Sequence, residues 1–223
     1  MSQQTPSQMP RPQPSVPPAP SRREDKKART RRALIVVSHR LFTRRGYAET
    51  TLEQICAEVG VHPQTLLRYF DSKADLALAP MHDVVRSLTD QLEDPDRELD
   101  AVEIWRRHVE TEAGRHNRAV ARYLAWLDAD PVLRAMLESL KTLHEDALAA
   151  ALAHDLGAPR DDLRAILLAS TLVRGNAAVT RRWMVDGADP ETLAERQLAV
   201  IDLVLLELPQ WTRPRVSKAD RTR

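Results

Sequence analysis

The stretch TTLEQICAEVGVHPQTLLRYFDSK, residues 50–73, decides the fold of the first part of this chain. Thr51 and Gln54 have the spacing of a capping box, in which each side chain accepts a hydrogen bond from the other residue's backbone N–H at the start of a helix. The apolar residues that follow have the spacing of one buried helix face; they are Leu52, Ile55, Cys56 and Val59. Gly60 supplies the left-handed residue that ends a helix. The sequence therefore predicts a short amphipathic helix between Thr51 and Gly60.

A second short helix is predicted directly after this turn. Pro63 suits the first helical position, because the N–H group that it lacks would have no partner there. The residue before a proline is held in an extended conformation, so His62 becomes the N-cap. Leu66 and Phe70 face one way. The polar side chains that remain free to face outward are Gln64, Thr65 and Arg68. Two short helices joined by a tight glycine turn form a helix-turn-helix, whose second helix enters the major groove of DNA.

This stretch resembles the DNA-binding domain of the tetracycline-repressor (TetR) family of bacterial transcriptional regulators, and the resemblance covers residues 27–87. The landmarks in register are Leu41-Phe42, Arg45-Gly46-Tyr47, Thr50-Thr51, Ile55, Gly60-Val61, Thr65-Leu66, Arg68-Tyr69-Phe70 and Ser72-Lys73. Three departures stand out. Cys56 stands where the family usually has a small Ala, and His62-Pro63-Gln64 replaces the usual Ser-Lys-Gly of the turn. Leu67 stands where the family often has a Tyr that touches DNA. The fold prediction is unaffected, but the base preference of this chain must be its own.

The resemblance implies an all-α homodimer that binds double-stranded DNA at an inverted-repeat operator, and a repressor that a small apolar effector releases from it. No cofactor is implied. Base edges would be met by His62, Pro63, Gln64, Thr65 and Arg68. Of these, Gln64 can address adenine and Arg68 guanine through paired hydrogen bonds. By resemblance, contacts to the DNA backbone come from Thr51, Tyr69 and Lys73.

The segment before the motif falls into two parts. Residues 1–21 hold seven prolines among small polar residues, so we expect a disordered arm. The run RREDKKARTRR, residues 22–32, then leads into a helix that ends near Gly46. Its arginines are placed to contact the DNA backbone or the adjacent minor groove; the ones that we single out are Arg29, Arg31 and Arg32. The alternative is that this run is a solvated lead-in to the helix.

Composition and charge favour a soluble helical protein that meets DNA at one end. The chain is 43% hydrophobic but only 4% aromatic, and its single cysteine excludes an internal disulfide and fits the reducing cytoplasm. No apolar run reaches the roughly 20 residues of a membrane span. Residues 22–73 hold twelve basic and six acidic residues, a net of +6, whereas residues 74–208 hold fifteen and twenty-five, a net of −10. Only the first part is therefore expected to meet phosphate, although a chance distribution on solvated faces would give the same numbers.

The remaining chain is predicted to be a second all-α domain. A helix starts near Ser72, with a kink or break at Pro80. Proline and glycine then separate further amphipathic helices, expected at 96–113, 116–128, 130–156, 160–186 and 190–208. Gly114 is one of these breakers. The domains predicted are a DNA-binding domain over 22–87, a ligand-binding and dimerisation domain over 88–208, and a basic flexible tail over 209–223. The last two helices are too apolar for one exposed face, so a symmetric partner is expected to cover them.

Large aromatic and scattered polar residues of this second domain are candidates for an effector cavity. They are Trp105, His108, Tyr123, Trp126, Met136, Asn176 and Trp183. The alternative is that they fill the core. We find no catalytic motif and no ligand spacing for a metal in the sequence. Two other functions stay open: an architectural DNA-binding protein with a filled second core and no effector, and an enzyme that reuses the scaffold.

Overall fold

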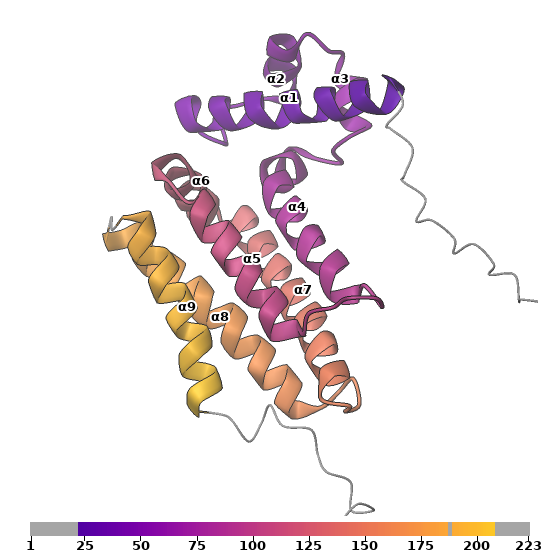
Figure 1. Ribbon diagram of the computed structural model, residues 1–223. Helices are drawn as coiled ribbons and strands as arrows, with labels where there is room; N and C mark the ends of the chain where they lie inside the picture. Colours follow the sequence, from indigo (N-terminus) through magenta and orange to yellow (C-terminus); the bar gives the residue numbers. More distant parts are fainter. Residues whose placement is uncertain (1–21, 187–188, 208–223) are drawn as a thin grey trace, which may run out of the picture.

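The computed structural model describes residues 22–186 and 189–207, and every regular element in these residues is an α-helix. The helices are α1 (Arg22–Arg45), α2 (Leu52–Val59), α3 (Pro63–Leu67), α4 (Lys73–Glu93), α5 (Ala101–Arg115), α6 (Arg118–Ala129), α7 (Pro131–Asp155), α8 (Leu163–Asp186) and α9 (Pro190–Glu207). The first three form a small unit, here called the head (Figure 1). Helices α5 to α9 form a larger unit, the body, and α4 connects the two (Figure 1). The all-α prediction is confirmed, while the predicted arm and tail lie outside the described residues.

The local signals of the motif act as predicted. Thr51 Oγ1 accepts a hydrogen bond from the Gln54 N–H at 3.2 Å, and Gln54 Oε1 accepts one from the Thr51 N–H at 3.0 Å, which completes the capping box. Gly60 ends α2 with a φ of +76°. His62 is the N-cap of α3, and its Nδ1 accepts from the Gln64 N–H at 3.3 Å. These contacts fix the angle between α2 and α3 within the chain segment itself.

Helix α4 runs without interruption through Pro80, so the break allowed for there does not occur. Proline cannot donate to the carbonyl of Leu76, one turn earlier. Beside it, the carbonyl of Ala77 accepts hydrogen bonds from the Tyr123 hydroxyl at 3.1 Å and from His39 Nε2 at 3.2 Å. Donors from α6 and α1 therefore meet α4 at the turn where the proline interrupts its own hydrogen bonding.

The predicted end of a helix at Gly114 is also wrong, because α5 continues to Arg115. A glycine near a helix end costs only about 1 kcal/mol relative to alanine, which packing readily offsets. The chain instead turns before Asn117, whose Oδ1 accepts from the N–H groups of Ala119 and Val120 as the N-cap of α6. Helix α5 likewise starts later than expected, after Asp100, which caps the Glu103 N–H at 2.8 Å.

Two hydrophobic cores hold the molecule together, and α4 contributes to both. Its first half, through Val85, packs with the head, and Leu88 and Leu92 pack with the body. The predicted domain boundary between residues 87 and 88 thus falls inside this helix. The core of the head also includes residues from the body; these are Tyr123, Leu127, Leu133 and Leu140.

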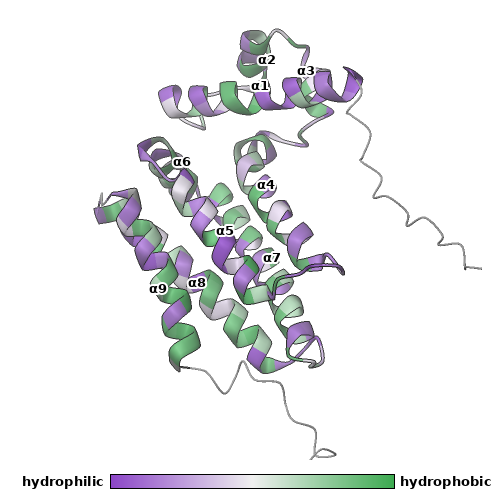
Figure 2. Ribbon diagram, viewed as in Figure 1, coloured by the Kyte–Doolittle hydropathy of each residue, from purple (hydrophilic) through white to green (hydrophobic). Residues whose placement is uncertain are grey.

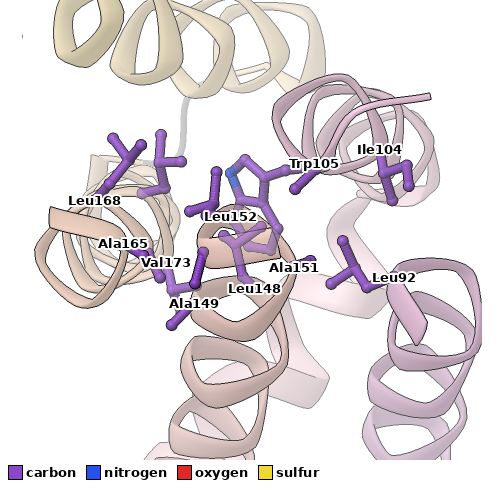
Figure 3. Close-up of a cluster of buried hydrophobic side chains, with 14 of the residues drawn as sticks. Leu92, Ile104, Trp105, Leu148, Ala149, Ala151, Leu152, Ala165, Leu168 and Val173 are labelled. Carbon is purple, nitrogen blue, oxygen red and sulfur yellow. The ribbon is translucent and has the colours of Figure 1, made fainter. Parts of the chain in front are cut away.

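The core of the body gathers around α7. Figure 3 shows Trp105 reaching from α5 toward Leu148 and Leu152 of α7, with Leu168 of α8 on the far side. Small residues bring α8 and α9 close together. A Cβ added at Gly175 would lie only 2.8 Å from Cγ1 of Val200, so that the glycine is needed for this approach. Helices α8 and α9 consequently lie side by side along one flank of the body (Figure 1).

Candidate functional sites

Helix α3 presents polar side chains that have nothing to bond to in the rest of the described chain. Gln64 and Arg68 are exposed, and neither the Gln64 amide nor the Arg68 guanidinium has a hydrogen-bond or ion-pair partner there. His62 is exposed and uses Nδ1 in the cap, while Pro63 and Thr65 are half-buried. Long polar groups held on a fixed helix end suit hydrogen bonding to base edges.

Leu67 is a further candidate on this surface, although in the sequence it stood out only as a departure from the family and was not assigned a contact with DNA. Its side chain is 53% exposed although the neighbouring Leu66 is fully buried. An apolar side chain on a recognition helix can contact the methyl group of thymine. The sequence could have indicated this role, because Leu67 occupies the position where the family often has a tyrosine that touches DNA.

The residues predicted to contact the DNA backbone divide into two groups. Arg29, Arg32 and Thr51 are exposed, and Tyr69 is half-buried with its ring 6.4 Å from that of Phe70. Arg29 Nε donates to the carbonyl of Asp25 at 3.3 Å, which leaves its other guanidinium nitrogens available. Arg31 and Lys73 form the second group, because both are engaged within the protein.

Arg31 makes a two-pronged ion pair with Asp83, at 2.8 and 2.9 Å, and its guanidinium carbon lies 5.5 Å from the centre of the Phe70 ring. It therefore holds α1 against α4. The Lys73 ammonium donates to the carbonyls of Tyr47 at 2.9 Å, Thr50 at 3.1 Å and Ala48 at 3.4 Å, and lies 4.3 Å from the centre of the Tyr47 ring. It ties the loop after α1 to the start of α4.

A cavity of about 1000 Å³ lies in the body beneath the head, with walls from α1 and from α4 to α9. Four of the seven predicted cavity residues line it, namely Trp105, His108, Tyr123 and Asn176. The other three face elsewhere. Trp126 stacks on Tyr47 at 6.0 Å in the core of the head, where Met136 also packs. Trp183 donates from Nε1 to the carbonyl of Asp189 at 3.1 Å. Helical periodicity predicts that these three side chains face the interior, but it does not predict which other side chains they contact.

Part of the cavity wall is an aromatic group of Trp105, His108 and His144. The ring centres of Trp105 and His108 are 5.4 Å apart in a stacked arrangement, and those of His108 and His144 are 5.6 Å apart edge to face. Burial lowers the pKa of His108 to about 3, with nearby His144 and Arg115 acting in the same direction. Burial lowers the pKa of His144 to about 4. Both imidazoles are therefore uncharged near neutral pH.

Several residues that line the cavity carry buried polar atoms without a partner in the described part of the chain. Asn176 is 5% exposed, and neither Oδ1 nor Nδ2 has a hydrogen-bond partner in the described part of the chain. The same holds for Trp105 Nε1, His144 Nε2 and Gln197 Oε1. Leaving a buried polar group unbonded costs roughly 1–3 kcal/mol, so the concentration of such groups on one cavity indicates a site for another molecule. The sequence did not single out His144 or Gln197.

The cavity reaches the head through His39 and Tyr123. Their rings stack with centres 4.6 Å apart, both line the cavity, and both bond to the carbonyl of Ala77 on α4. Burial lowers the pKa of His39 and raises the pKa of Tyr123. Two neutral donors, one from α1 and one from α6, therefore share a single acceptor on the connecting helix.

Comparisons with known proteins agree with this architecture. The family model described as bacterial regulatory proteins, tetR family, matches residues 34–79, from α1 into α4. The HTH-type transcriptional regulator TcmR of Streptomyces glaucescens is 46% identical over 67 residues. Residues 34–79 of this chain therefore form a segment of the TetR type. The segment that matches TcmR is 30% of this chain and spans 30% of the length of TcmR.

Solved structures share the fold of this chain over both head and body. The complex of SmeT with triclosan has a TM-score of 0.60 at 22% identity and covers 80% of this chain and 91% of SmeT. SmeT is described as the repressor of the Stenotrophomonas maltophilia multidrug efflux pump SmeDEF. GusR of Salmonella enterica has a TM-score of 0.57 at 18% identity and covers 81% of this chain and 96% of GusR.

The described residues contain neither a helix that could span a membrane nor a group of side chains that could hold a metal ion. No helix among them combines the length and the apolar character that crossing a membrane requires. Within the same residues, His, Cys, Asp and Glu side chains form no group of three or more that could hold a metal ion.

Proposed function

We propose that this protein is a ligand-responsive, sequence-specific regulator of transcription of the TetR family, a repressor that a small effector releases from its operator. The proposal rests on the helix-turn-helix, whose Gln64 and Arg68 face outward without partners. Buried or paired side chains could not serve this purpose, since base recognition needs free donors and acceptors. The net charge of +6 over residues 22–73 supports the same surface as the one that meets phosphate.

Phosphate contacts would come first from Arg29, Arg32, Thr51 and Tyr69. Arg31 and Lys73 already have carboxylate or carbonyl partners within the protein. Each could contact DNA only by sharing or leaving those partners. For these two residues, we propose that positioning the head is the main role and any contact with phosphate is secondary.

A homodimer would form through α8 and α9. Apolar residues on these helices remain exposed at helical spacing, and they are Leu163, Ile166, Leu167, Leu203 and Leu206. The C-terminal half of α9 is largely hydrophobic in Figure 2. A contiguous apolar surface on two adjacent helices is typical of a protein interface. Two heads related by a two-fold axis would match an inverted-repeat operator.

Effector binding in the cavity would act on the head through α4. A molecule beside His39 and Tyr123 touches the two side chains that bond to the carbonyl of Ala77. Displacing either one changes how α1 and α6 hold the turn around Pro80. A ligand that prefers the changed arrangement lowers the affinity for operator, and operator lowers the affinity for that ligand by the same factor.

The two alternatives fit the structure less well. An architectural DNA-binding protein without an effector would have a filled second core, whereas the body holds a cavity of about 1000 Å³. An enzyme on this scaffold would need convergent titratable groups. The two buried histidines at the cavity have pKa values of about 3 and about 4, which are far below those useful for proton transfer near neutral pH.

The central experiment is selection of DNA fragments by the purified protein, followed by binding of variants to selected and random DNA. Gln64→Ala should lose roughly 1–3 kcal/mol on selected DNA, the value of a paired base contact, and little on random DNA. Gln91→Ala is the matched control, because Gln91 is an exposed glutamine on the far half of α4. Equal losses of Gln64→Ala on both kinds of DNA would rule out its role in base recognition. Failure to select any sequence would overturn the proposed function.

The dimer is tested by placing a charge on its proposed interface. Leu203→Asp should give monomers in analytical ultracentrifugation and should weaken operator binding together with dimerisation. The side chain is 58% exposed, so the fold of the monomer does not depend on it. Val132→Asp is the control, since Val132 is 62% exposed and belongs to α7, which is not one of the two helices of the proposed interface. A wild-type protein that is monomeric at micromolar concentration would contradict this arrangement.

A further inference from the structure

We infer that the cavity takes an uncharged molecule with a flat ring system that bears both hydrogen-bond donors and acceptors, such as hydroxyl and carbonyl groups. The regulatory role of that molecule rests on the proposed function, but its chemistry is argued from the cavity alone. The inference replaces the purely apolar effector expected from the sequence with a more specific class.

The walls favour flat rings. Trp105, His108 and His144 form one continuous aromatic group, with neighbouring ring centres 5.4 to 6.1 Å apart. Such faces gain from offset stacking or edge-to-face contact with another ring. A volume of about 1000 Å³ is at the upper end of the roughly 300–1,000 Å³ of small-molecule sites, so there is room for several fused rings.

The unpartnered groups require a ligand that both donates and accepts. Asn176 offers an N–H donor and a carbonyl acceptor, and both lack partners within the described residues. Trp105 Nε1 adds a donor and Gln197 Oε1 an acceptor, while the Gln197 amide nitrogen is already bonded to Thr180 Oγ1 at 2.9 Å. These groups come from α5, α8 and α9, so the ligand must present polar atoms in several directions. A hydrocarbon would leave all of them unbonded, which is unfavourable.

The charges around the cavity favour a neutral ligand. The imidazoles of His108 and His144 are uncharged near neutral pH. Among the charged lining residues, Asp83 is paired with Arg31, Arg115 with Glu112 and Lys141 with Glu138. Arg44 and Arg181 have no ion-pair partner in the described part of the chain, and both are exposed. Because the two unpaired cations of the wall are exposed and hydrated, an anion would gain little from them, and moving it out of water would be costly.

Three probes that differ in one substituent test this class: 2-(hydroxymethyl)anthraquinone, 2-methylanthraquinone and anthraquinone-2-carboxylate. Isothermal titration calorimetry at neutral pH gives their affinities for the full-length protein. The hydroxymethyl compound should bind about tenfold more tightly than the methyl compound, the gain from one hydrogen bond to an otherwise unbonded buried group. The carboxylate should bind more weakly than both. Tightest binding by the carboxylate, equal affinities for the two neutral probes, or no binding by any probe would each overturn the inference.

Two variants separate hydrogen bonding from shape. Asn176→Leu keeps the approximate size of the side chain but removes its donor and acceptor. The tenfold preference for the hydroxymethyl probe should fall to about one to threefold, while the methyl probe binds at least as tightly as before. Trp105→Phe keeps an aromatic wall without the N–H and should reduce the same preference. A full preference retained in both variants would show that these groups do not meet the ligand.

Operator binding of the same proteins, measured without probes, distinguishes this inference from the proposed function. If the probe affinities fail to follow the expected order but selected DNA is still bound, only the ligand class is wrong. If the probes follow the order but no DNA sequence is selected, the cavity chemistry stands and the regulatory role is wrong.

Discussion

The head and the body place their unpartnered polar side chains in different positions. The two buried polar residues of α1 and the loop after it are satisfied locally: the Ser38 hydroxyl donates to the carbonyl of Ile35, and the Thr50 hydroxyl to that of Gly46. The free groups of the head, such as those of Gln64 and Arg68, point to solvent. The body instead buries Asn176 without partners beside a cavity. DNA is too large to be enclosed, so the groups that could bind it lie on the surface of the head. A small ligand can be enclosed, so the groups that could bind it lie inside the body.

Acid should act mainly on the body and gives the largest effect that we expect. Unfolded histidines take up protons below a pH of about 6.5, but in the folded protein His108 and His144 do so only near pH 3 and pH 4. The unfolded state therefore binds more protons, and stability falls as the pH is lowered from 6.5. Each histidine contributes about 1.4 kcal/mol per pH unit, or about 4 kcal/mol for the pair at pH 5.

The acid effect is measured from urea unfolding at several pH values. The double variant His108→Gln/His144→Gln is the comparison, because it keeps polar side chains that do not titrate. Its free energy of unfolding should depend less on pH between 6.5 and 5 than that of the wild-type protein. Parallel curves for the two proteins would show that the buried imidazoles titrate normally.

Packing should also differ between the interior of the head and the wall of the cavity, where Leu140 contacts the core of the head on one side only. Leu66 in the head is fully buried, and Leu66→Ala should lower the free energy of unfolding by about 3 kcal/mol. Leu140 on α7 is 5% exposed but lines the cavity, so that part of its surface has no neighbour. Leu140→Ala should cost about half as much, because it removes fewer contacts. Urea unfolding followed by circular dichroism measures both, and equal costs would mean that the cavity wall is as tightly packed as the head.

Lys73 distinguishes positioning of the head from direct contact with DNA. Lys73→Met keeps the aliphatic stem but removes the hydrogen bonds to the carbonyls of Tyr47, Ala48 and Thr50. Hydrogen bonds to a charged group contribute about 2 kcal/mol, so we expect a loss of stability of that size. A purely phosphate-binding lysine would instead leave stability unchanged and reduce the salt dependence of DNA binding by about one unit. Thermal unfolding without DNA, together with binding at several salt concentrations, separates the two outcomes.

The smallest change in stability is expected at two glycines that both have open space around them but differ in backbone conformation. Neither Gly60 nor Gly114 has a heavy atom within 4 Å of an added Cβ. Gly60 has a φ of +76°, so Gly60→Ala should cost about 1 kcal/mol. Gly114 lies inside α5, where alanine is preferred, and Gly114→Ala should gain about 0.5–1 kcal/mol. Thermal unfolding measures both, and changes of the same sign would contradict the assignment of the turn to Gly60.

Much of the head was predictable because its determinants are close together in sequence. Thr51, Gln54, Gly60, His62 and Pro63 act on backbone groups two to four residues away, and the structure shows the caps in place. The exposure of Gln64 and Arg68 follows from the same short-range periodicity. Pro80 does not break its helix and Gly114 does not end its helix, for the opposite reason. Each lies in a helix whose packing against other helices outweighs a local preference.

The sequence by itself therefore determined the helical class, the helix-turn-helix and the side chains that it turns outward, since these depend on neighbours within a few residues. Only the tertiary structure decided which inward-facing residues meet. Trp105 and Asn176 line the cavity while Trp126 and Trp183 do not, and His144 and Gln197 join it from other helices. The partners of Arg31 and Lys73 were likewise hidden, because they lie 52 and 23 to 26 residues away along the chain. Helical periodicity defines an inner face, but the relative rotation of packed helices sets what that face contacts.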